Sequence, residues 1–289
     1  MQPRIPGEPL GILAGGGRLP HLVAAAAASH GWTPYIIALG DGRSEDWQGF
    51  HHRDYAWGRV GNAIAEMKAR GIVRMVLCGT ISVRPDFRSI FPSLATLRIL
   101  PDVLRIVRGG DDSVLRAVTR FLERRGFEAL AVHDIAPELL MPDGLLTGRG
   151  PTAADEAALE RAMDAVRFLG RQDIGQAVVA SADRVIALEA IEGTRAMLQR
   201  VADLRQGGKI GRTERCVLVK SVKPQQDLRF DLPSIGASTM EEAGRAGLTG
   251  IGLSAGHAIL IDADAVLAAA GKHGLFLTGL SAERLLEGA

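Results

Sequence analysis

LGILAGGGRLPHLVAAAAASH, residues Leu10–His30, is the stretch that decides the fold of the first half of the chain. Leu10–Ala14 is an apolar run typical of a buried strand. Gly15–Gly17 follow as a glycine loop, and Pro20–His30 predict an alanine-rich helix. A strand, a glycine loop and a helix in this order are the first unit of an α/β fold.

The same alternation continues beyond this stretch. Apolar runs at Tyr35–Leu39 and Ile72–Cys78 predict two further strands, and Val60–Arg70 predicts the helix before the second of them. Strands that alternate with helices favour a parallel, doubly wound sheet. We expect residues 82–126 to be mostly helical and Phe127–His133 to form a last strand, which completes a domain over residues 1–136.

Residues 137–151 differ from their surroundings, because they carry three prolines and three glycines and show no hydrophobic period. We interpret them as the connection between two domains. The second domain, residues 152–289, is predicted to begin with a helix over about Thr152–Leu169 and to continue as a mixture of strands and helices. The polar run Ser238–Glu241 resembles a capping box that opens a short helix.

Composition limits the class of protein. Of the 289 residues, 47% are hydrophobic and 4% aromatic, and the net charge is +1, so the chain is globular and is not expected to bind nucleic acid. Cys78 and Cys216 lie in separate apolar runs and are predicted to be buried thiols of a cytoplasmic protein. We see neither a signal peptide nor a run of about 20 apolar residues that could span a membrane. The absence of such a run does not exclude peripheral contact of the protein with a membrane or a lipid.

The glycine loop does not match either common nucleotide fingerprint. A dinucleotide motif requires a third glycine where Pro20 stands, and no Gly-Lys-Ser/Thr follows the loop. Two interpretations remain for Gly15, Gly16 and Gly17. Their N–H groups and the helix start could bind a phosphate or nucleotide, or the glycines could only form a tight turn.

Two other places have residues suited to phosphate or metal chemistry. Gly79-Thr80 lies at the carboxyl end of the predicted strand Ile72–Cys78, and Arg84 follows shortly after. Arg84 could bind phosphate, as ligands bind at such strand ends, or it could pair with a nearby acid. Glu189 and Glu192 flank the end of another apolar run, which suits a metal or phosphate site. The alternative there is a simple strand end, with Thr194 capping the next helix.

The stretch LVKSVKPQQDLRFDLPSIG, residues Leu218–Gly236, concentrates charge where a strand begins. Its charged and amide residues are Lys220, Lys223, Gln225, Gln226, Asp227, Arg229 and Asp231. Between Asp227 and Leu232 polar and apolar residues alternate, as in an extended segment. This pattern favours a site with both signs of charge, or a half-buried edge strand with one solvated face.

Several stretches, in the same order along nearly the whole chain, resemble the LpxI family of UDP-2,3-diacylglucosamine pyrophosphatases, enzymes of bacterial lipid A biosynthesis. In the first half they are LGILAGGGRLP (Leu10–Pro20), GTISVRP (Gly79–Pro85) and DDSVLR (Asp111–Arg116). In the second half they are DIGQAVV (Asp173–Val179), ALEAIEGT (Ala187–Thr194) and VKPQQDLRFDLPSIG (Val222–Gly236). The last is the longest, and it keeps the family pattern KPxQDxRxDxPxxG throughout.

The resemblance implies a Rossmann-like N-terminal domain and a C-terminal α/β domain of unusual fold. It implies hydrolysis of the substrate to UMP and 2,3-diacylglucosamine 1-phosphate (lipid X), with Mg²⁺ or another divalent cation. The essential aspartate of the motif corresponds to Asp227. The UDP-linked diacylated glucosamine lipid is the expected partner, on the cytosolic side and in peripheral contact with the inner membrane, and the enzyme is expected to be a homodimer.

On this basis we assign expected roles to the site residues. Asp227 would bind the metal or orient water, while Lys220, Lys223 and Arg229 offset phosphate charge. The residues expected to bind substrate are Gly15, Gly16, Gly17, Thr80, Arg84, Gln176, Thr194 and Gln226.

The metal ligands need a further choice. On an extended strand the α-carbons of Asp227 and Asp231 would lie about 13 Å apart. We therefore expect Asp227 to share the metal with Glu192 or Glu189.

Two functions of other classes are weighed against hydrolysis. One is a non-catalytic nucleotide- or lipid-binding protein. The other is a nicotinamide-dependent oxidoreductase, which Pro20 in the glycine loop argues against.

Overall fold

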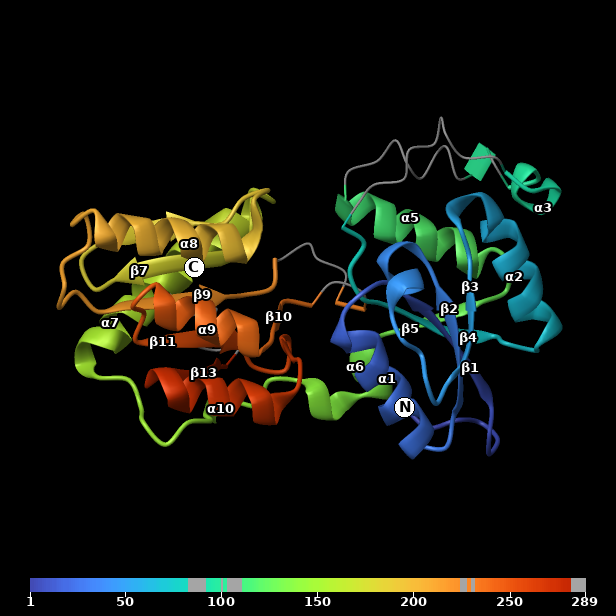
Figure 1. The fold of residues 1–289 in the computed structure, drawn as a ribbon, viewed down its shortest axis with the longest axis horizontal. Helices are drawn as coiled ribbons and strands as arrows, with labels where there is room; N and C mark the ends of the chain where they lie inside the picture. Colours follow the sequence, from blue (N-terminus) through green and yellow to red (C-terminus); the bar gives the residue numbers. More distant parts are fainter. Residues whose placement is uncertain (83–91, 100, 103–110, 224–227, 230–231, 282–289) are drawn as a thin grey trace. The chain divides into compact units, whose positions relative to one another are not determined.

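The computed structural model of the protein describes residues 1–82, 92–99, 101–102, 111–223, 228–229 and 232–281. The chain forms two compact units, Met1–Glu138 and Leu139–Ala289. Figure 1 follows the chain through both. Among the described residues, no helix is both long enough and apolar enough to cross a membrane.

The first unit contains a five-stranded sheet in the order β3-β2-β1-β4-β5, and all four pairings are parallel. Its strands are β1 (Pro9–Ala14), β2 (Thr33–Ala38), β3 (His51–Asp54), β4 (Arg74–Cys78) and β5 (Glu128–Leu130). The prediction of a parallel, doubly wound sheet is therefore confirmed. Side chains of β1, β2 and β4 form the centre of its core, where Leu10, Ile12, Ile36 and Val76 are fully buried.

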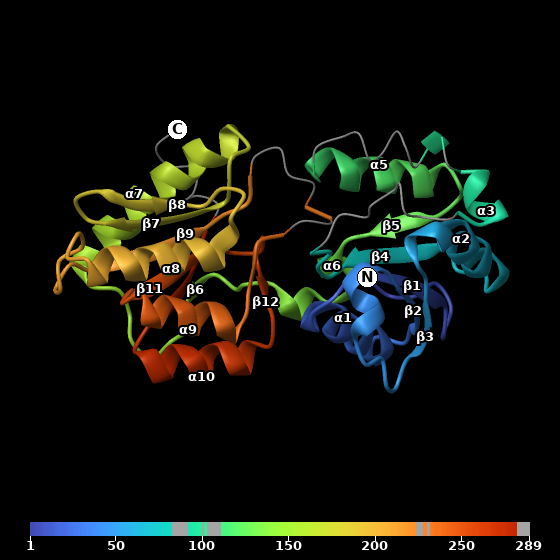
Figure 2. The ribbon, with the colours of Figure 1, turned by 45° about the horizontal axis from the view of Figure 1, so that its top comes forward.

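Helices cover both faces of this sheet, with α1 and α5 on opposite faces (Figure 2). The helical segments are α1 (Arg18–Ser29), η1 (Gly40–Ser44), η2 (Trp57–Arg59), α2 (Val60–Ala69), α3 (Leu94–Leu97), α5 (Asp111–Glu123), α6 (Val132–Ile135) and η3 (Pro137–Leu139). One expectation was wrong at the end of this unit. The predicted strand Phe127–His133 stops at Leu130, and His133 lies in α6, because Asp134 accepts a hydrogen bond from the Ala131 N–H and starts a helix there.

The second unit contains a mixed six-stranded sheet in the order β6-β13-β11-β9-β7-β8. Its strands are β6 (Gly144–Leu145), β7 (Ala177–Ser181), β8 (Val185–Leu188), β9 (Cys216–Lys220), β11 (Gly250–Ser254) and β13 (Phe276–Leu280). β9, β11 and β13 are parallel, whereas β6, β7 and β8 each run antiparallel to their neighbours. A separate two-stranded parallel pair joins β10 (Ser234–Ile235) and β12 (Ile259–Leu260).

The sheet of the second unit is the middle of three layers. Its helices are α7 (Ala153–Arg171), α8 (Gly193–Gln206), α9 (Ala237–Arg245) and α10 (Ala263–His273). Val178 and Val217 pack with α7 on one face, and their neighbours Val179 and Leu218 pack with α8 and α9 on the other. This alternation along β7 and β9 leaves no solvated face, so both strands are apolar throughout. Figure 2 shows α7 on one side and the other three helices on the opposite side.

Two local expectations in the second unit differ from the structure. Much of segment 137–151 packs within the second unit, because the Met141 N–H donates to Ala258 O and β6 pairs with β13. The capping-box interpretation of Ser238–Glu241 was wrong, since α9 begins one residue before Ser238 and is preceded by Gly236. Thr239 donates its N–H to the Gly236 carbonyl instead.

A buried carboxylate, Asp155, ties α7 to the sheet. It is fully buried, and its oxygens accept hydrogen bonds from Arg215 at 2.6 and 2.9 Å, from Thr249 at 2.6 Å and from Thr152 at 2.7 and 2.8 Å. Burial alone would raise the pKa of Asp155, but these donors outweigh it and lower the pKa to about 2. The carboxylate therefore stabilises the folded state in its charged form.

We expect Asp155→Asn to lower the free energy of unfolding by about 2–4 kcal/mol at pH 7, because Arg215 loses its charged partner. The pKa of Asp155 in the folded state lies below the ordinary aspartate pKa of 3.8, so its contribution to stability is present above about pH 4 and is lost as the pH falls toward 2. Urea unfolding of wild type and variant between pH 7 and pH 3 measures this. A difference that does not shrink at low pH would contradict the assignment.

Candidate functional site

Several chain segments meet at the carboxyl ends of β9 and β11. Leu253 pairs with Lys220 across the two parallel strands, so both end at the same edge of the sheet. Antiparallel β7 starts there, with Ala177 opposite Lys220, and β8 ends there at Leu188. The polar residues at this edge, named the polar edge below, are Gln176, Glu189, Thr194, Lys220, Ser221 and Ser254.

A chain of hydrogen bonds joins a buried cation to a buried anion at the polar edge. Lys220 is 8% exposed and its Nζ donates to Thr194 Oγ1 at 3.1 Å and to Ser234 O at 3.3 Å. Thr194 in turn donates to Glu189 Oε1 at 2.5 Å, and Glu189 is 6% exposed. Burying two charges is costly unless they are paired and hydrogen-bonded, and here one hydroxyl links them. Thr194, Lys220 and Glu189, all predicted from the sequence, are thus brought together.

Gln176 completes the surroundings of Glu189. Its backbone N–H donates to Glu189 Oε2 at 3.2 Å, and its carbonyl accepts from the Ser221 N–H at 3.0 Å. A Cβ on Gly175 would lie 2.1 Å from Glu189 O, so glycine is required for this close approach. The Gln176 side-chain Oε1 is buried and has no hydrogen-bond partner among the described residues. The predicted substrate-binding Gln176 therefore lies beside the carboxylate, with a free acceptor.

Sequence reasoning missed Ser221 and Ser254 of the polar edge, and also Asp173, which pairs with the predicted Lys223. Ser254 Oγ donates to Ser221 Oγ at 2.9 Å, and both side chains are buried. Lys223 Nζ lies 2.7 Å from Asp173 Oδ1, and Asp173 has a φ of 55°, which is unusual for a residue other than glycine. A serine at the end of a strand has no sequence pattern that marks it as functional. Asp173 could have been predicted, because it is the first residue of the DIGQAVV stretch (Asp173–Val179).

Glu192, expected as a metal ligand, pairs with an arginine. Its Oε1 pairs with Arg200 at 3.0 Å, and its Oε2 accepts the Ala190 N–H at 3.1 Å. The same guanidinium donates to Leu188 O at 2.8 Å, which holds Glu192 on the exposed outer side of β8. Across the described ranges, no three His, Cys, Asp or Glu side chains gather in an arrangement that could hold a metal ion.

Part of the predicted site falls outside the described residues. Asp227, Gln226 and Arg84 are not described, nor is Asp231. Of the alternating segment 227–232, Leu228, Arg229 and Leu232 are described, and Leu228 and Arg229 form a turn. Arg229 is half-buried.

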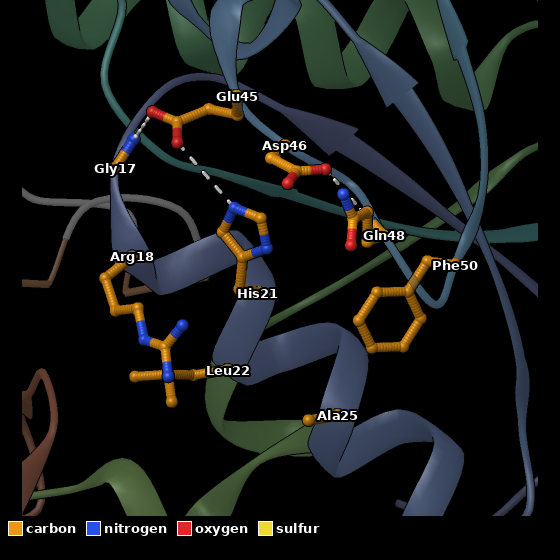
Figure 3. A pocket seen from close by; sticks show the side chains of 9 residues that line it. All are labelled: Gly17, Arg18, His21, Leu22, Ala25, Glu45, Asp46, Gln48 and Phe50. Carbon is orange, nitrogen blue, oxygen red and sulfur yellow. Dashed lines mark hydrogen bonds and ion pairs between the residues drawn. The ribbon is translucent and has the colours of Figure 1, made fainter.

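In the glycine loop of the first unit, the backbone N–H groups of all three glycines donate to other groups of the protein. The N–H groups of Gly15 and Gly16 donate to Cys78 O at 2.9 Å and Thr80 O at 2.8 Å. Thr80 donates back to Gly16 O at 2.9 Å. The Gly17 N–H donates to Glu45 Oε1 at 2.7 Å, so a carboxylate already occupies the start of α1 (Figure 3). These three N–H groups hold the loop against its neighbours, so none of the three is available to bind an anion.

Close packing explains the glycines. A Cβ on Gly15 would lie 2.5 Å from Thr80 O, and one on Gly16 would lie 2.8 Å from Asp41 Cβ. Gly17 has a φ of 94°, which side chains other than glycine rarely adopt. Thr80 is exposed, and in this loop it serves the pairing with Gly16.

The polar edge has the features of a site for phosphate chemistry. Lys220 ends β9 and is linked through Thr194 to the buried Glu189 carboxylate, and Lys223 follows three residues later and pairs with Asp173. In open α/β sheets ligands bind beyond the carboxyl ends of parallel strands, and β9 and β11 are such a pair. Ammonium groups there can offset phosphate charge, and a nearby carboxylate can position a donor or a metal-bound water.

Comparison with known proteins agrees with this division of the chain. Residues 9–139 match the LpxI N-terminal domain, and residues 142–278 match the LpxI C-terminal domain. The chain is 38% identical over 273 residues to UDP-2,3-diacylglucosamine pyrophosphatase LpxI of Caulobacter vibrioides, a match that covers 94% of this chain and 97% of that protein. Because both domains match in order and the likeness extends over almost the full length, the chain belongs to the LpxI family.

Proposed function

We propose that this protein hydrolyses the pyrophosphate of UDP-2,3-diacylglucosamine to UMP and 2,3-diacylglucosamine 1-phosphate, a reaction of lipid A biosynthesis. The observation that carries the proposal is the 38% identity to the pyrophosphatase of Caulobacter vibrioides over 94% of the chain. The polar edge supports it independently. There the buried Lys220, three residues before the family motif at residues 223–236, is linked through Thr194 to the buried Glu189 carboxylate.

In the proposed reaction, a water oxygen bonds to one phosphorus and the bond from that phosphorus to the bridging oxygen breaks. One product leaves with the bridging oxygen, and the water proton passes to a base. The negative charge that develops on the phosphoryl oxygens needs preorganised cations. We assign that role to Lys220 and Lys223, with Arg229, and the role of base or metal ligand to Asp227.

The hydrogen-bond chain at the polar edge gives Lys220 its position. Thr194 and Ser234 fix the ammonium group at the end of β9, and Glu189 fixes Thr194. A cation held in this way needs no rearrangement when charge develops next to it, which is the advantage of a preorganised site. Gln176, whose buried Oε1 has no partner among the described residues, is assigned to substrate binding.

The residues fit a magnesium ion that is held mainly by substrate. Magnesium commonly takes one or two protein carboxylates and completes its shell with phosphate oxygens and waters. Among the described residues no three His, Cys, Asp or Glu side chains are placed to hold a metal ion. Glu192 pairs with Arg200, and Glu189 accepts hydrogen bonds from Thr194 and Gln176. Asp227, with Glu189 or Glu192 as the second carboxylate, would hold the ion. When bound, the ion would polarise a phosphoryl oxygen and acidify water.

We expect removal of divalent cations to abolish the activity. With excess EDTA, UMP release from UDP-2,3-diacylglucosamine should fall to below about 1% of the rate in magnesium, because the developing phosphoryl charge loses its strongest stabiliser. Excess magnesium should restore the rate. Full turnover in EDTA, after dialysis against the chelator, would contradict the metal requirement while leaving the hydrolase assignment in place.

A further inference from the structure

Asp173 follows the end of α7, in a turn that other helices of the chain share. The Asp173 N–H donates to Gly170 O at 3.1 Å, and the Ile174 N–H donates to Leu169 O at 3.2 Å. These two bonds form a Schellman motif, in which the residue after the C-cap adopts a left-handed backbone. Asp173 is that residue, with a φ of 55°.

Every other described helix of nine residues or more ends in the same pair of hydrogen bonds, with glycine at the corresponding position. The helices are α1, α2, α5, α8, α9 and α10, and the φ of these glycines lies between 64° and 88°. The glycines are Gly31, Gly71, Gly126, Gly208, Gly247 and Gly274. A Cβ on Gly71 or Gly126 would meet no atom within 4 Å, so the backbone angle and not the space calls for glycine. At α7 the chain places aspartate instead.

An aspartate at this position is unfavourable for the helix itself. Side chains other than glycine are strained at positive φ, although aspartate and asparagine adopt this region more readily than most. The carboxylate also lies at the carboxyl end of a 19-residue helix, where the helix dipole disfavours negative charge. Strain of this kind is typical of functional positions, so the role of the carboxylate lies outside the helix.

The Asp173 carboxylate pairs with Lys223, the first residue of the family motif at residues 223–236. Lys223 Nζ lies 2.7 Å from Asp173 Oδ1, and the lysine side chain is 15% exposed, whereas that of Asp173 is 52% exposed. The two segments run side by side beyond the sheet, because β7 pairs with β9 and the Ser221 N–H donates to Gln176 O at 3.0 Å. The ion pair therefore continues the contact between these two strands toward the motif.

The loop that carries Asp173 also closes on the buried carboxylate of the polar edge. A Cβ on Gly175 would lie 2.1 Å from Glu189 O, and the Gln176 N–H donates to Glu189 Oε2 at 3.2 Å. Residues 173–176 thus contact both Glu189 and Lys223. This short loop therefore links the Lys223 ammonium group to the groups of the polar edge.

We propose that Asp173 is a positioning residue for the hydrolysis. Its carboxylate holds the Lys223 ammonium group beyond the end of β9, so that this cation is already in place when negative charge develops on the phosphoryl oxygens. Glycine at residue 173 would suit α7 better but would remove this partner of Lys223. The inference rests on the proposed function, which gives Lys223 its role toward phosphate.

Two substitutions of Asp173 separate activity from stability. Asp173→Asn and Asp173→Gly should each lower kcat for UMP release by about tenfold, because the position of a catalytic cation is lost. Asp173→Gly should also raise the unfolding midpoint by about 1–4 °C, since glycine removes the strain at positive φ and the lost carboxylate is half-exposed. A fall in the midpoint of Asp173→Gly would show that Asp173 serves the fold, and it would overturn the inference.

A double variant shows whether Asp173 acts through Lys223. Lys223→Met should lower kcat by about tenfold or more. Adding Asp173→Asn to it should change kcat by less than about twofold, because the carboxylate then has no ammonium group to hold. A purely structural role of Asp173 would make the two effects multiply, and that result would overturn the inference, as would wild-type kcat in Asp173→Asn alone.

Asp164→Asn is the matched control on the same helix. Asp164 pairs with Arg167 at 2.5 Å, and the Arg167 side chain is 16% exposed, close to the value for Lys223. The change therefore breaks an ion pair of similar length and burial outside the 173–176 loop. We expect kcat and KM of Asp164→Asn to stay within about twofold of wild type.

A second measurement does not depend on turnover. Brief labelling with acetic anhydride, followed by mass spectrometry of the peptides, reports how accessible each lysine nitrogen is. Lys223 should be labelled at least about threefold faster in Asp173→Asn than in wild type, because the ion pair shields its nitrogen. The exposed Lys209 should be labelled at the same rate in both proteins.

The two measurements distinguish failure of the inference from failure of the proposed function. Unchanged labelling of Lys223 in Asp173→Asn would overturn the inference even when hydrolysis is normal. Faster labelling, in a protein whose wild type releases no UMP, would show that Asp173 holds Lys223 while the proposed hydrolase function fails.

Discussion

Asp227→Asn is expected to lower kcat for UDP-2,3-diacylglucosamine by about 10³-fold, within the range found when a general base is lost. The change removes one negative charge and keeps the size of the side chain. An amide cannot accept a proton from the attacking water, and it is a poorer magnesium ligand than a carboxylate. The expectation rests on the family motif, in which Asp227 corresponds to the essential aspartate. Initial rates of UMP release measure it.

Asp231→Asn is the matched control for this variant. It makes the same chemical change four residues later in the same motif, and we expect less than about a tenfold loss. Thermal unfolding and lipid-binding measurements on both variants separate loss of chemistry from loss of fold. Undiminished turnover in Asp227→Asn would remove Asp227 from the mechanism, and an equal loss in Asp231→Asn would show that the two aspartates act together.

Lys220→Met is expected to lower kcat by about 10²–10³-fold, because a preorganised cation at the developing phosphate charge is lost. Lys220 is 8% exposed, and its ammonium group is fixed by Thr194 and Ser234. Methionine keeps the length and the apolar stem but supplies no charge. The variant also leaves the Glu189 carboxylate without its nearby cation, so its unfolding midpoint should fall as well.

Lys209→Met provides the comparison, since Lys209 is exposed in the turn after α8. It should retain wild-type kcat and stability. Assays below the unfolding midpoint of Lys220→Met separate the catalytic effect from the structural one. If Lys220 only pairs with Glu189 through Thr194, the folded variant will turn over substrate at the wild-type rate, and that result would exclude Lys220 from catalysis.

The hydrophobic pattern predicted much of the fold. Apolar runs at Leu10–Ala14 and Ile72–Cys78, the second interrupted by Arg74, correspond to central parallel strands, since such strands are buried on both faces. β3 was not predicted, because His51–Asp54 is polar and exposed at all four positions and pairs only as an edge strand. Val132 and His133, the first half of α6, were predicted as strand because the four residues of this helix are too few to show a helical period.

The candidate site was partly predictable for a similar reason. Lys220 and Glu189 interrupt buried apolar runs, and a charge in such a place signals a paired or functional group. The direction of a side chain depends on its tertiary neighbours, so the ion pair between Glu192 and Arg200 could not be predicted from the spacing of Glu189 and Glu192. The hydrogen bond from the Gly17 N–H to Glu45 at the start of α1 could not be predicted from the sequence either, because the two residues lie 28 positions apart along the chain.

The central claim, that this chain cleaves a pyrophosphate with water, is tested most directly by the oxygen balance of the reaction. Purified wild-type protein is incubated with UDP-2,3-diacylglucosamine and magnesium in ¹⁸O-water, and the masses of both products are measured by mass spectrometry. We predict UMP and 2,3-diacylglucosamine 1-phosphate in equal amounts, with one ¹⁸O atom in one product of each pair. Release of UDP with an unphosphorylated diacylglucosamine, or no UMP at all, would contradict the account.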